Sequence, residues 1–170
     1  MVSSPFDSYI VIAPIAASFA GFGSLASGLG RGPGGDDARV DATRLSLMLF
    51  ASLTATLLGL LPMTLAGILL DEVLAVRISA LVALIAIPAY AVVGLRRAAK
   101  LRQTSGFSKA GVLSNVACAT LAFAAFFLCL VGFPTGRLPA AYLVGLMGVL
   151  GSSAIMFLLV IMSMLRRHDR

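Results

Sequence analysis

The chain has 170 residues, of which 59% are hydrophobic and only 12% are charged, with a formal net charge of +6. A soluble domain has about 25% charged residues, so this composition excludes an ordinary water-soluble protein. It also excludes intrinsic disorder, which requires low hydrophobicity. The composition indicates a membrane protein, and the length indicates a single domain over residues 1–170.

The charged residues are confined to short segments that separate five long uncharged stretches. A helix needs about 20 mostly apolar residues to cross about 30 Å of hydrocarbon, so each stretch can cross once and none can cross twice. We therefore predict an all-α polytopic transmembrane helical bundle. Its five expected spans are about 8–30, 45–70, 75–95, 111–133 and 140–165.

The distribution of positive charge predicts the orientation. With the N-terminus outside and the C-terminus inside, eleven Lys and Arg residues fall on the cytoplasmic side and two, Arg77 and Arg137, fall outside. Short cytoplasmic loops carry such an excess of positive charge. The first span has Asp7 but no Lys or Arg before it, which favours an uncleaved anchor over a signal peptide. The overall look is that of a multi-pass protein of a bacterial inner membrane.

The positive loops also predict a lipid partner. Basic residues beside a membrane surface attract anionic headgroups, and the segment between the third and fourth spans is the most basic one. Nucleic acid is not expected as a partner, because no basic patch is interleaved with aromatic residues. The residues expected to meet anionic headgroups are Arg96, Arg97, Lys100 and Arg102.

Small residues recur at four-residue spacing, most densely in the first span. Such rows lie along one helix face and let another helix approach closely. We therefore predict that the first span is a central, buried packing helix, and that rows in the second and fifth spans also pack. The candidates are Ala16, Ala20, Gly21, Ser24, Gly28, Ala55, Gly59, Gly145, Gly148 and Ser152.

The few polar residues within the spans support an alternative. Ser52 and Thr56 form a hydroxyl row in the second span, before a kink expected at Pro62, and Asn115 is the only amide in a span. Together they are the candidate lining of a small channel. In the fourth span, Asn115 shares a small-residue stripe that should face neighbouring helices, while Phe126 and its neighbouring phenylalanines should face lipid.

The sequence offers no catalytic residues, no cofactor site and no metal ligands. No catalytic triad can form, because the only histidine, His168, follows the last span. Cys118 and Cys129 lie about 16 Å apart along one helix and are too far apart to form a disulfide. An enzyme is therefore not expected. We expect a protein that acts through helix packing, as a subunit, an assembly partner or a homo-oligomer; the alternative is a small channel or facilitator with uncharged walls.

Overall fold

The computed structural model describes residues 5–29, 36–101, 109–131 and 135–168, and almost all of them are helical. A short 3₁₀ turn, η1 (Thr135–Arg137), precedes the last helix. The five α-helices are α1 (Pro5–Leu29), α2 (Asp36–Leu69), α3 (Glu72–Leu101), α4 (Lys109–Val131) and α5 (Leu138–His168). The expected all-α helical bundle is confirmed.

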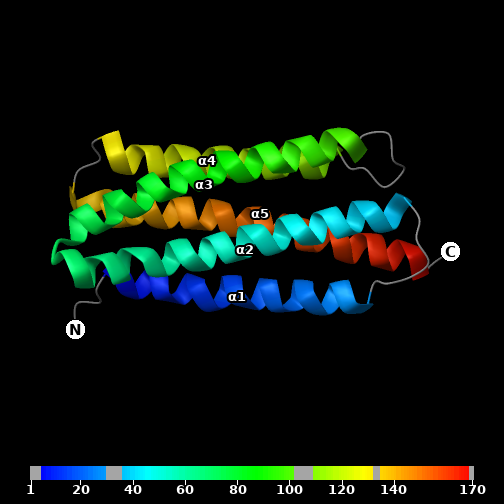
Figure 1. The fold of residues 1–170 in the computed structure, drawn as a ribbon, viewed down its shortest axis with the longest axis horizontal. Coiled ribbons are helices and arrows are strands. Elements are labelled where there is room, and N and C mark those ends of the chain that lie inside the picture. Colours follow the sequence, from blue (N-terminus) through cyan, green and yellow to red (C-terminus); the bar gives the residue numbers. More distant parts are fainter. Residues whose placement is uncertain (1–4, 30–35, 102–108, 132–134, 169–170) are drawn as a thin grey trace.

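The helices run side by side as an antiparallel bundle (Figure 1). α2, α3, α4 and α5 form a ring in which each helix packs against the next, and α5 closes the ring against α2. α1 lies outside the ring and contacts α2 and, less extensively, α5. The prediction of a central first helix is therefore wrong, because α2 and α5 occupy the centre.

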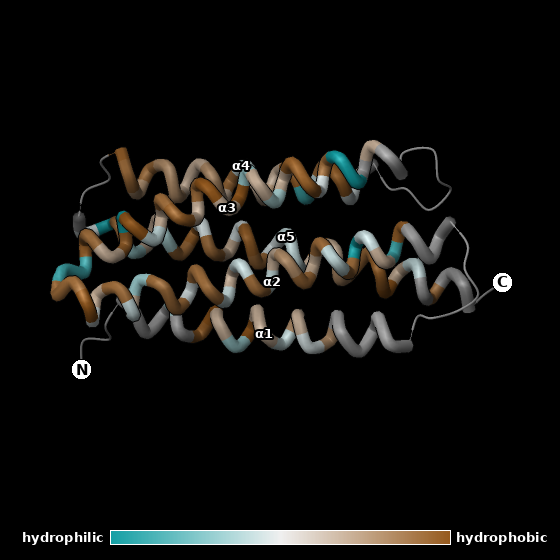
Figure 2. Tube along the Cα trace, viewed as in Figure 1, coloured by the Kyte–Doolittle hydropathy of each residue, from teal (hydrophilic) through white to brown (hydrophobic). Residues whose placement is uncertain are grey.

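Four helices are long and apolar enough to cross a membrane. Figure 2 shows apolar residues along their middle parts and hydrophilic residues gathered near the two ends of the bundle. In α1, whose side chains after Phe22 lie outside the described residues, the described apolar stretch is Val11–Phe22. The four candidate spans are Val40–Leu69, Glu72–Arg97, Ala110–Val131 and Leu138–Ser163.

All four spans begin earlier than the sequence predicts, and the spans in α2 and α3 take in charged residues. The span in α2 includes Asp41 and Arg44, whose side chains form an i,i+3 ion pair at 3.2 Å. Ser163 on α5 donates a 2.8 Å hydrogen bond to the same carboxylate. The span in α3 includes Arg77, which is half-buried and whose Nε has no hydrogen-bond partner among the described residues.

The turn between α2 and α3 shows why these two long helices stay separate. Leu70 ends α2 in the left-handed region, with φ of 56°. The carboxylate of Asp71 then accepts hydrogen bonds from the backbone N–H groups of Val73, at 2.9 Å, and Leu74, at 3.1 Å. This is the N-cap arrangement that satisfies the first donors of a helix, and Glu72 adds a favourable negative charge to the first turn.

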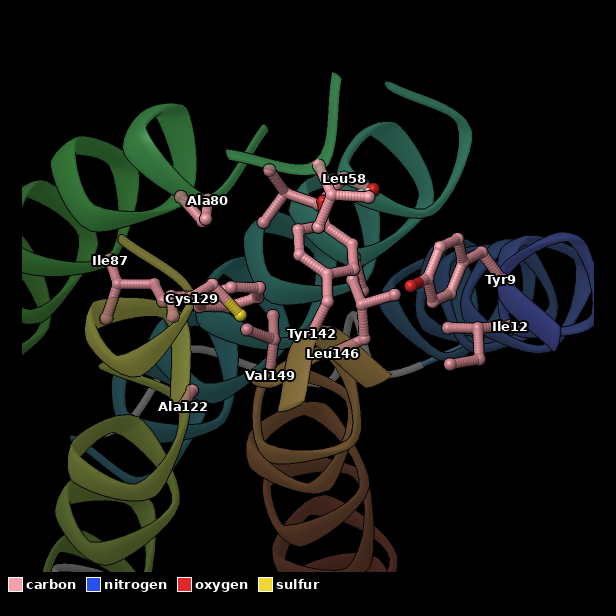
Figure 3. Packing of buried hydrophobic residues seen from close by; sticks show 14 of the residues in the cluster. Tyr9, Ile12, Leu58, Ala80, Ile87, Ala122, Cys129, Tyr142, Leu146 and Val149 are labelled. Atoms are coloured by element: carbon pink, nitrogen blue, oxygen red, sulfur yellow. Dashed lines mark hydrogen bonds between the residues drawn. The ribbon is translucent and has the colours of Figure 1, made fainter. Parts of the chain in front are cut away.

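The main apolar core is centred on Tyr142 of α5 (Figure 3). Its ring makes edge contacts with Tyr9, at 5.2 Å between centroids, and with Phe126, at 5.1 Å. The Tyr9 hydroxyl in turn donates a 3.1 Å bond to the carbonyl of Pro139, which ties α1 to the start of α5. Phe126 is fully buried, so the prediction that it faces lipid is wrong; its neighbour Phe127 is 48% exposed.

Candidate functional site

A seam of polar side chains crosses the interior of the bundle from α2 to α4. On the α2 side, the hydroxyls of Ser52 and Ser153 lie 2.6 Å apart, and both residues are fully buried. Ser153 also donates a 3.2 Å hydrogen bond to the carbonyl of Met48. Each hydroxyl therefore has a partner within the protein, which removes the cost of burying it in an apolar interior.

The next residue of α5 continues the seam on the other side. Ser152 donates a short hydrogen bond to Oδ1 of Asn115 on α4, and its hydroxyl lies 3.4 Å from that of Tyr90 on α3. Because consecutive helix residues point in different directions, the pair Ser152–Ser153 joins α3 and α4 on one side to α2 on the other. We call Tyr90, Asn115 and Ser152 the polar triad.

A cavity of about 250 Å³ adjoins the polar triad. Tyr90 and Asn115 line it, and small residues of α3 and α4, among them Ala91, Gly94 and Ala119, provide its space. A smaller cavity of about 20 Å³ lies beside it and shares Tyr90 and Ala119. An apolar cavity with a few convergent polar groups is the usual form of a small-ligand site.

The three residues predicted to line a channel do not all line the two cavities described above. Asn115 lines the larger cavity, whereas Ser52 and Thr56 line neither of the two. The Thr56 hydroxyl donates a 2.9 Å bond to the carbonyl of Ser52 one turn earlier, which satisfies it within its own helix. Ser52 nevertheless belongs to the same polar seam as Asn115, through Ser153 and its neighbour Ser152.

Several predicted packing residues lie where helices meet most closely. A Cβ added at Gly145 would stand 2.7 Å from the ring of Phe126, and one at Gly148 would stand 2.9 Å from Cβ of Ala122. At Gly59 it would stand 3.2 Å from the carbonyl oxygen of Tyr9. These glycines permit close approach of α5 to α4 and of α2 to α1. Ala16, Ala55 and Ser152 are buried as well.

The small residues of α1 divide between two faces. Ala16 is buried and Ala20 is half-buried, but Gly21 is exposed and a Cβ added there would meet no atom within 4 Å. The Gly21 position therefore has space for a larger side chain among the described residues. Ser24 and Gly28 belong to α1, but their side chains lie outside the described residues.

The basic residues expected at lipid headgroups lie at the C-terminal end of α3. Arg96 and Arg97 are exposed, and Arg97 donates a 2.8 Å hydrogen bond to the Ser46 hydroxyl of α2. The side chain of Lys100 and the whole of Arg102 lie outside the described residues.

Tyr90 and Ser153 are the members of the seam that sequence reasoning missed as polar partners. Tyr90 reads as an interface anchor, because tyrosine is common near the ends of spans. Ser153 stands beside a predicted packing residue, and a serine in an apolar helix gives no sign of which neighbour it will contact. The pairing of hydroxyls across helices depends on helix rotation, which composition does not encode.

Within the described ranges, no group of three or more His, Cys, Asp or Glu side chains could hold a metal ion. Comparison of the chain with protein-family models, with curated proteins and with solved structures finds no match.

Proposed function

We propose that the protein is an integral membrane protein that acts through helix packing and associates with a second copy of itself through the outer face of α1. The observation that carries this proposal is the exposure of small residues on that face. Ala17 and Gly21 are both exposed, four residues apart on one side of the helix. Spacing of this kind lets two helices in a membrane approach closely.

The neighbouring residues on this face are compatible with close contact. Pro14 and Ser18 are exposed beside Ala17, and the Ser18 hydroxyl donates a 2.8 Å bond to the carbonyl of Pro14. Ser18 therefore brings no unsatisfied donor into an interface. Val11 and Phe22, both more than half exposed, flank the small residues and supply apolar contact area.

A second copy is the partner that fits this face most simply. A helix that presents a small residue every fourth position can pack against the same positions of an identical helix, as in closed two-fold dimers. Lipid offers no hydrophobic reason for helices to associate, so close van der Waals contact must supply the attraction. Small exposed residues are the feature that makes such contact possible.

The proposal includes five membrane spans, with the N-terminus outside and the C-terminus in the cytoplasm of a bacterial cell. Support comes from the eleven Lys and Arg residues that this topology places on the cytoplasmic side. In the bundle, the ends of α1, α3 and α5 and the starts of α2 and α4 all lie at one end (Figure 1), as a five-span topology requires. A reporter that works only in the cytoplasm should be active when it is fused after Arg170 and inactive at the N-terminus. The opposite result would reverse the orientation.

Self-association is tested by comparing two glycine substitutions. Gly21→Leu places a bulky side chain on the proposed interface, whereas Gly67→Leu does so on α2, where a Cβ would also meet no atom within 4 Å. The measurement is energy transfer between donor-labelled and acceptor-labelled copies in phospholipid vesicles, at several protein-to-lipid ratios. We expect wild type and Gly67→Leu to associate, and Gly21→Leu to need at least tenfold more protein. A monomeric wild type, or equal behaviour of both variants, would refute the proposal.

A further inference from the structure

The cavity between α3 and α4 has the properties of a ligand site. Its volume of about 250 Å³ exceeds the 150 Å³ of an engineered apolar cavity that binds benzene. Protein interiors are otherwise packed with few voids larger than a water molecule. Three of the residues that line it, Ala91 and Gly94 of α3 and Ala119 of α4, are small and leave space that larger residues would fill.

The walls of the cavity show from which side a ligand would enter. Leu95, Val116 and Phe123 line it and are 50%, 40% and 40% exposed on the outside of the bundle. The cavity is therefore accessible from the outer surface of the α3–α4 pair. For helices that span a membrane this surface faces lipid, so the ligand would come from the bilayer and be mostly apolar.

The polar triad supplies hydrogen-bond donors at one place in this wall. Asn115 accepts the bond from Ser152 through its oxygen, and its NH₂ group lies within hydrogen-bonding reach of the Tyr90 oxygen. The 3.4 Å separation between the hydroxyls of Tyr90 and Ser152 is longer than a normal O–H···O bond. An NH₂ group carries two hydrogens, so Asn115 keeps a second N–H beside the one that faces Tyr90. This N–H and the hydroxyl of Tyr90 can donate to an acceptor oxygen on a ligand.

The depth of the triad indicates the kind of oxygen. Tyr90 precedes Arg96 by six residues, or about 9 Å along the helix axis. Arg96 is exposed at the end of the span, where cations meet lipid headgroups. The interfacial layer on each side of the hydrocarbon is about 5–7 Å thick, so the triad lies just below its inner boundary. The ester carbonyls of a phospholipid lie near this boundary, where the acyl chains begin.

We infer that the α3–α4 cavity binds one acyl chain of a phospholipid, whose ester carbonyl accepts hydrogen bonds from Asn115 and Tyr90. The chain lies against Ala91, Ala119 and Phe123, and the headgroup stays at the level of Arg96. The inference rests on membrane placement of α3 and α4 but not on self-association through α1, which lies on the other side of the ring.

The first test compares a filled cavity with a matched surface change. Ala119→Leu places a larger side chain in the cavity, whereas Ala117→Leu adds the same bulk at an exposed position of α4. Each protein is extracted from vesicles of ester-linked phosphatidylglycerol and phosphatidylcholine, and retained phospholipid is counted by native mass spectrometry. We expect one phospholipid per chain for wild type and Ala117→Leu, and at least a tenfold lower occupancy for Ala119→Leu. Equal occupancy in all three proteins would overturn the inference.

The second test uses wild-type protein and so does not depend on how a variant folds. Vesicles of ester-linked phosphatidylglycerol are compared with vesicles of the ether-linked lipid, which lacks the carbonyl acceptor. A single net hydrogen bond corresponds to about a two- to tenfold preference for the ester lipid. Equal retention of the two lipids, or retention of a membrane-soluble molecule without a headgroup in place of phospholipid, would show that the assignment is wrong.

Discussion

The Tyr142 hydroxyl donates a 2.7 Å hydrogen bond to the carbonyl oxygen of Leu58, across the interface between α5 and α2. In a regular helix this carbonyl would accept from the N–H of residue 62, but residue 62 is proline and has no N–H. A backbone carbonyl without a donor is costly in an apolar interior, and a side chain of a neighbouring helix can restore the bond. Tyr142 thus replaces the donor that Pro62 removes.

This relationship predicts the effect of two substitutions. Tyr142→Phe should lower the free energy of unfolding by about 1–2 kcal/mol, because it leaves the Leu58 carbonyl buried without a donor. Pro62→Ala restores the backbone N–H, so in that background Tyr142→Phe should cost less than about 0.5 kcal/mol. The measurement is a double-mutant cycle of unfolding in mixed micelles. Additive costs would show that Tyr142 acts only through the packing of its ring.

The close contact of α5 with α4 predicts a contrast between two glycines. Gly148→Ala should destabilise the bundle by about 1–3 kcal/mol, because the new Cβ would lie 2.9 Å from Ala122 and 3.0 Å from the backbone oxygen of Cys118. Gly67→Ala has open space and should stabilise α2 by up to about 1 kcal/mol through helix propensity. Thermal unfolding in detergent measures both. A neutral Gly148→Ala would mean that α4 and α5 separate easily.

Phe126 and Phe127 are adjacent in sequence but differ in surroundings. Phe126→Ala should cost about 3–5 kcal/mol, because its fully buried ring packs on Tyr142 and over Gly145. Phe127→Ala serves as the control and should cost far less, because its ring is 48% exposed. The measurement is the unfolding midpoint of each variant in the same detergent. Similar midpoints would contradict the rotation of α4 that buries Phe126 and exposes Phe127.

The hydroxyl pair between α2 and α5 should couple these helices only modestly. Ser52→Ala and Ser153→Ala each remove one side of the 2.6 Å contact. Interhelical hydrogen bonds of this type in membranes average about 0.6 kcal/mol and reach about 1.7 kcal/mol. A coupling energy within this range is expected from the double-mutant cycle of unfolding. A coupling of zero would indicate that Ser153 relies on its bond to the Met48 carbonyl alone.

The basic segment after α3 should help to set the orientation. Changing Arg96, Arg97, Lys100 and Arg102 together to Gln removes four of the eleven residues assigned to the cytoplasmic side. Each contributes about 1 kcal/mol of attraction to an anionic leaflet, so a dual reporter should detect a mixed topology. Changing Arg77 and Arg137 to Gln is the control and should leave the topology uniform, because it strengthens the positive-inside bias. Uniform topology in the first variant would show that this segment is not a determinant.

The positions of small residues predicted several sites of close helix packing, but they did not predict which helix packs against each site. Gly145, Gly148 and Gly59 stand out in apolar helices because glycine lowers helix propensity and permits close approach. Gly21 has the same local sequence features and yet faces outward. The residues that match these glycines lie on other helices, so only the assembled bundle distinguishes a close contact between helices from an exposed position. The polar triad could not be predicted for the same reason, because its members come from three different helices, α3, α4 and α5.

The sequence by itself determined that this protein is an all-helical bundle of apolar helices, because the separation of charged from uncharged segments follows from the cost of placing charge in hydrocarbon. It also indicated the break between α2 and α3 at Asp71, although both helices extend beyond the spans predicted from the sequence. Only the tertiary structure decided that α1 lies at the edge, that Phe126 is buried and that Tyr142 compensates Pro62. These features depend on how each helix is rotated about its axis, and that rotation is fixed by side-chain packing and hydrogen bonds between segments far apart in the chain.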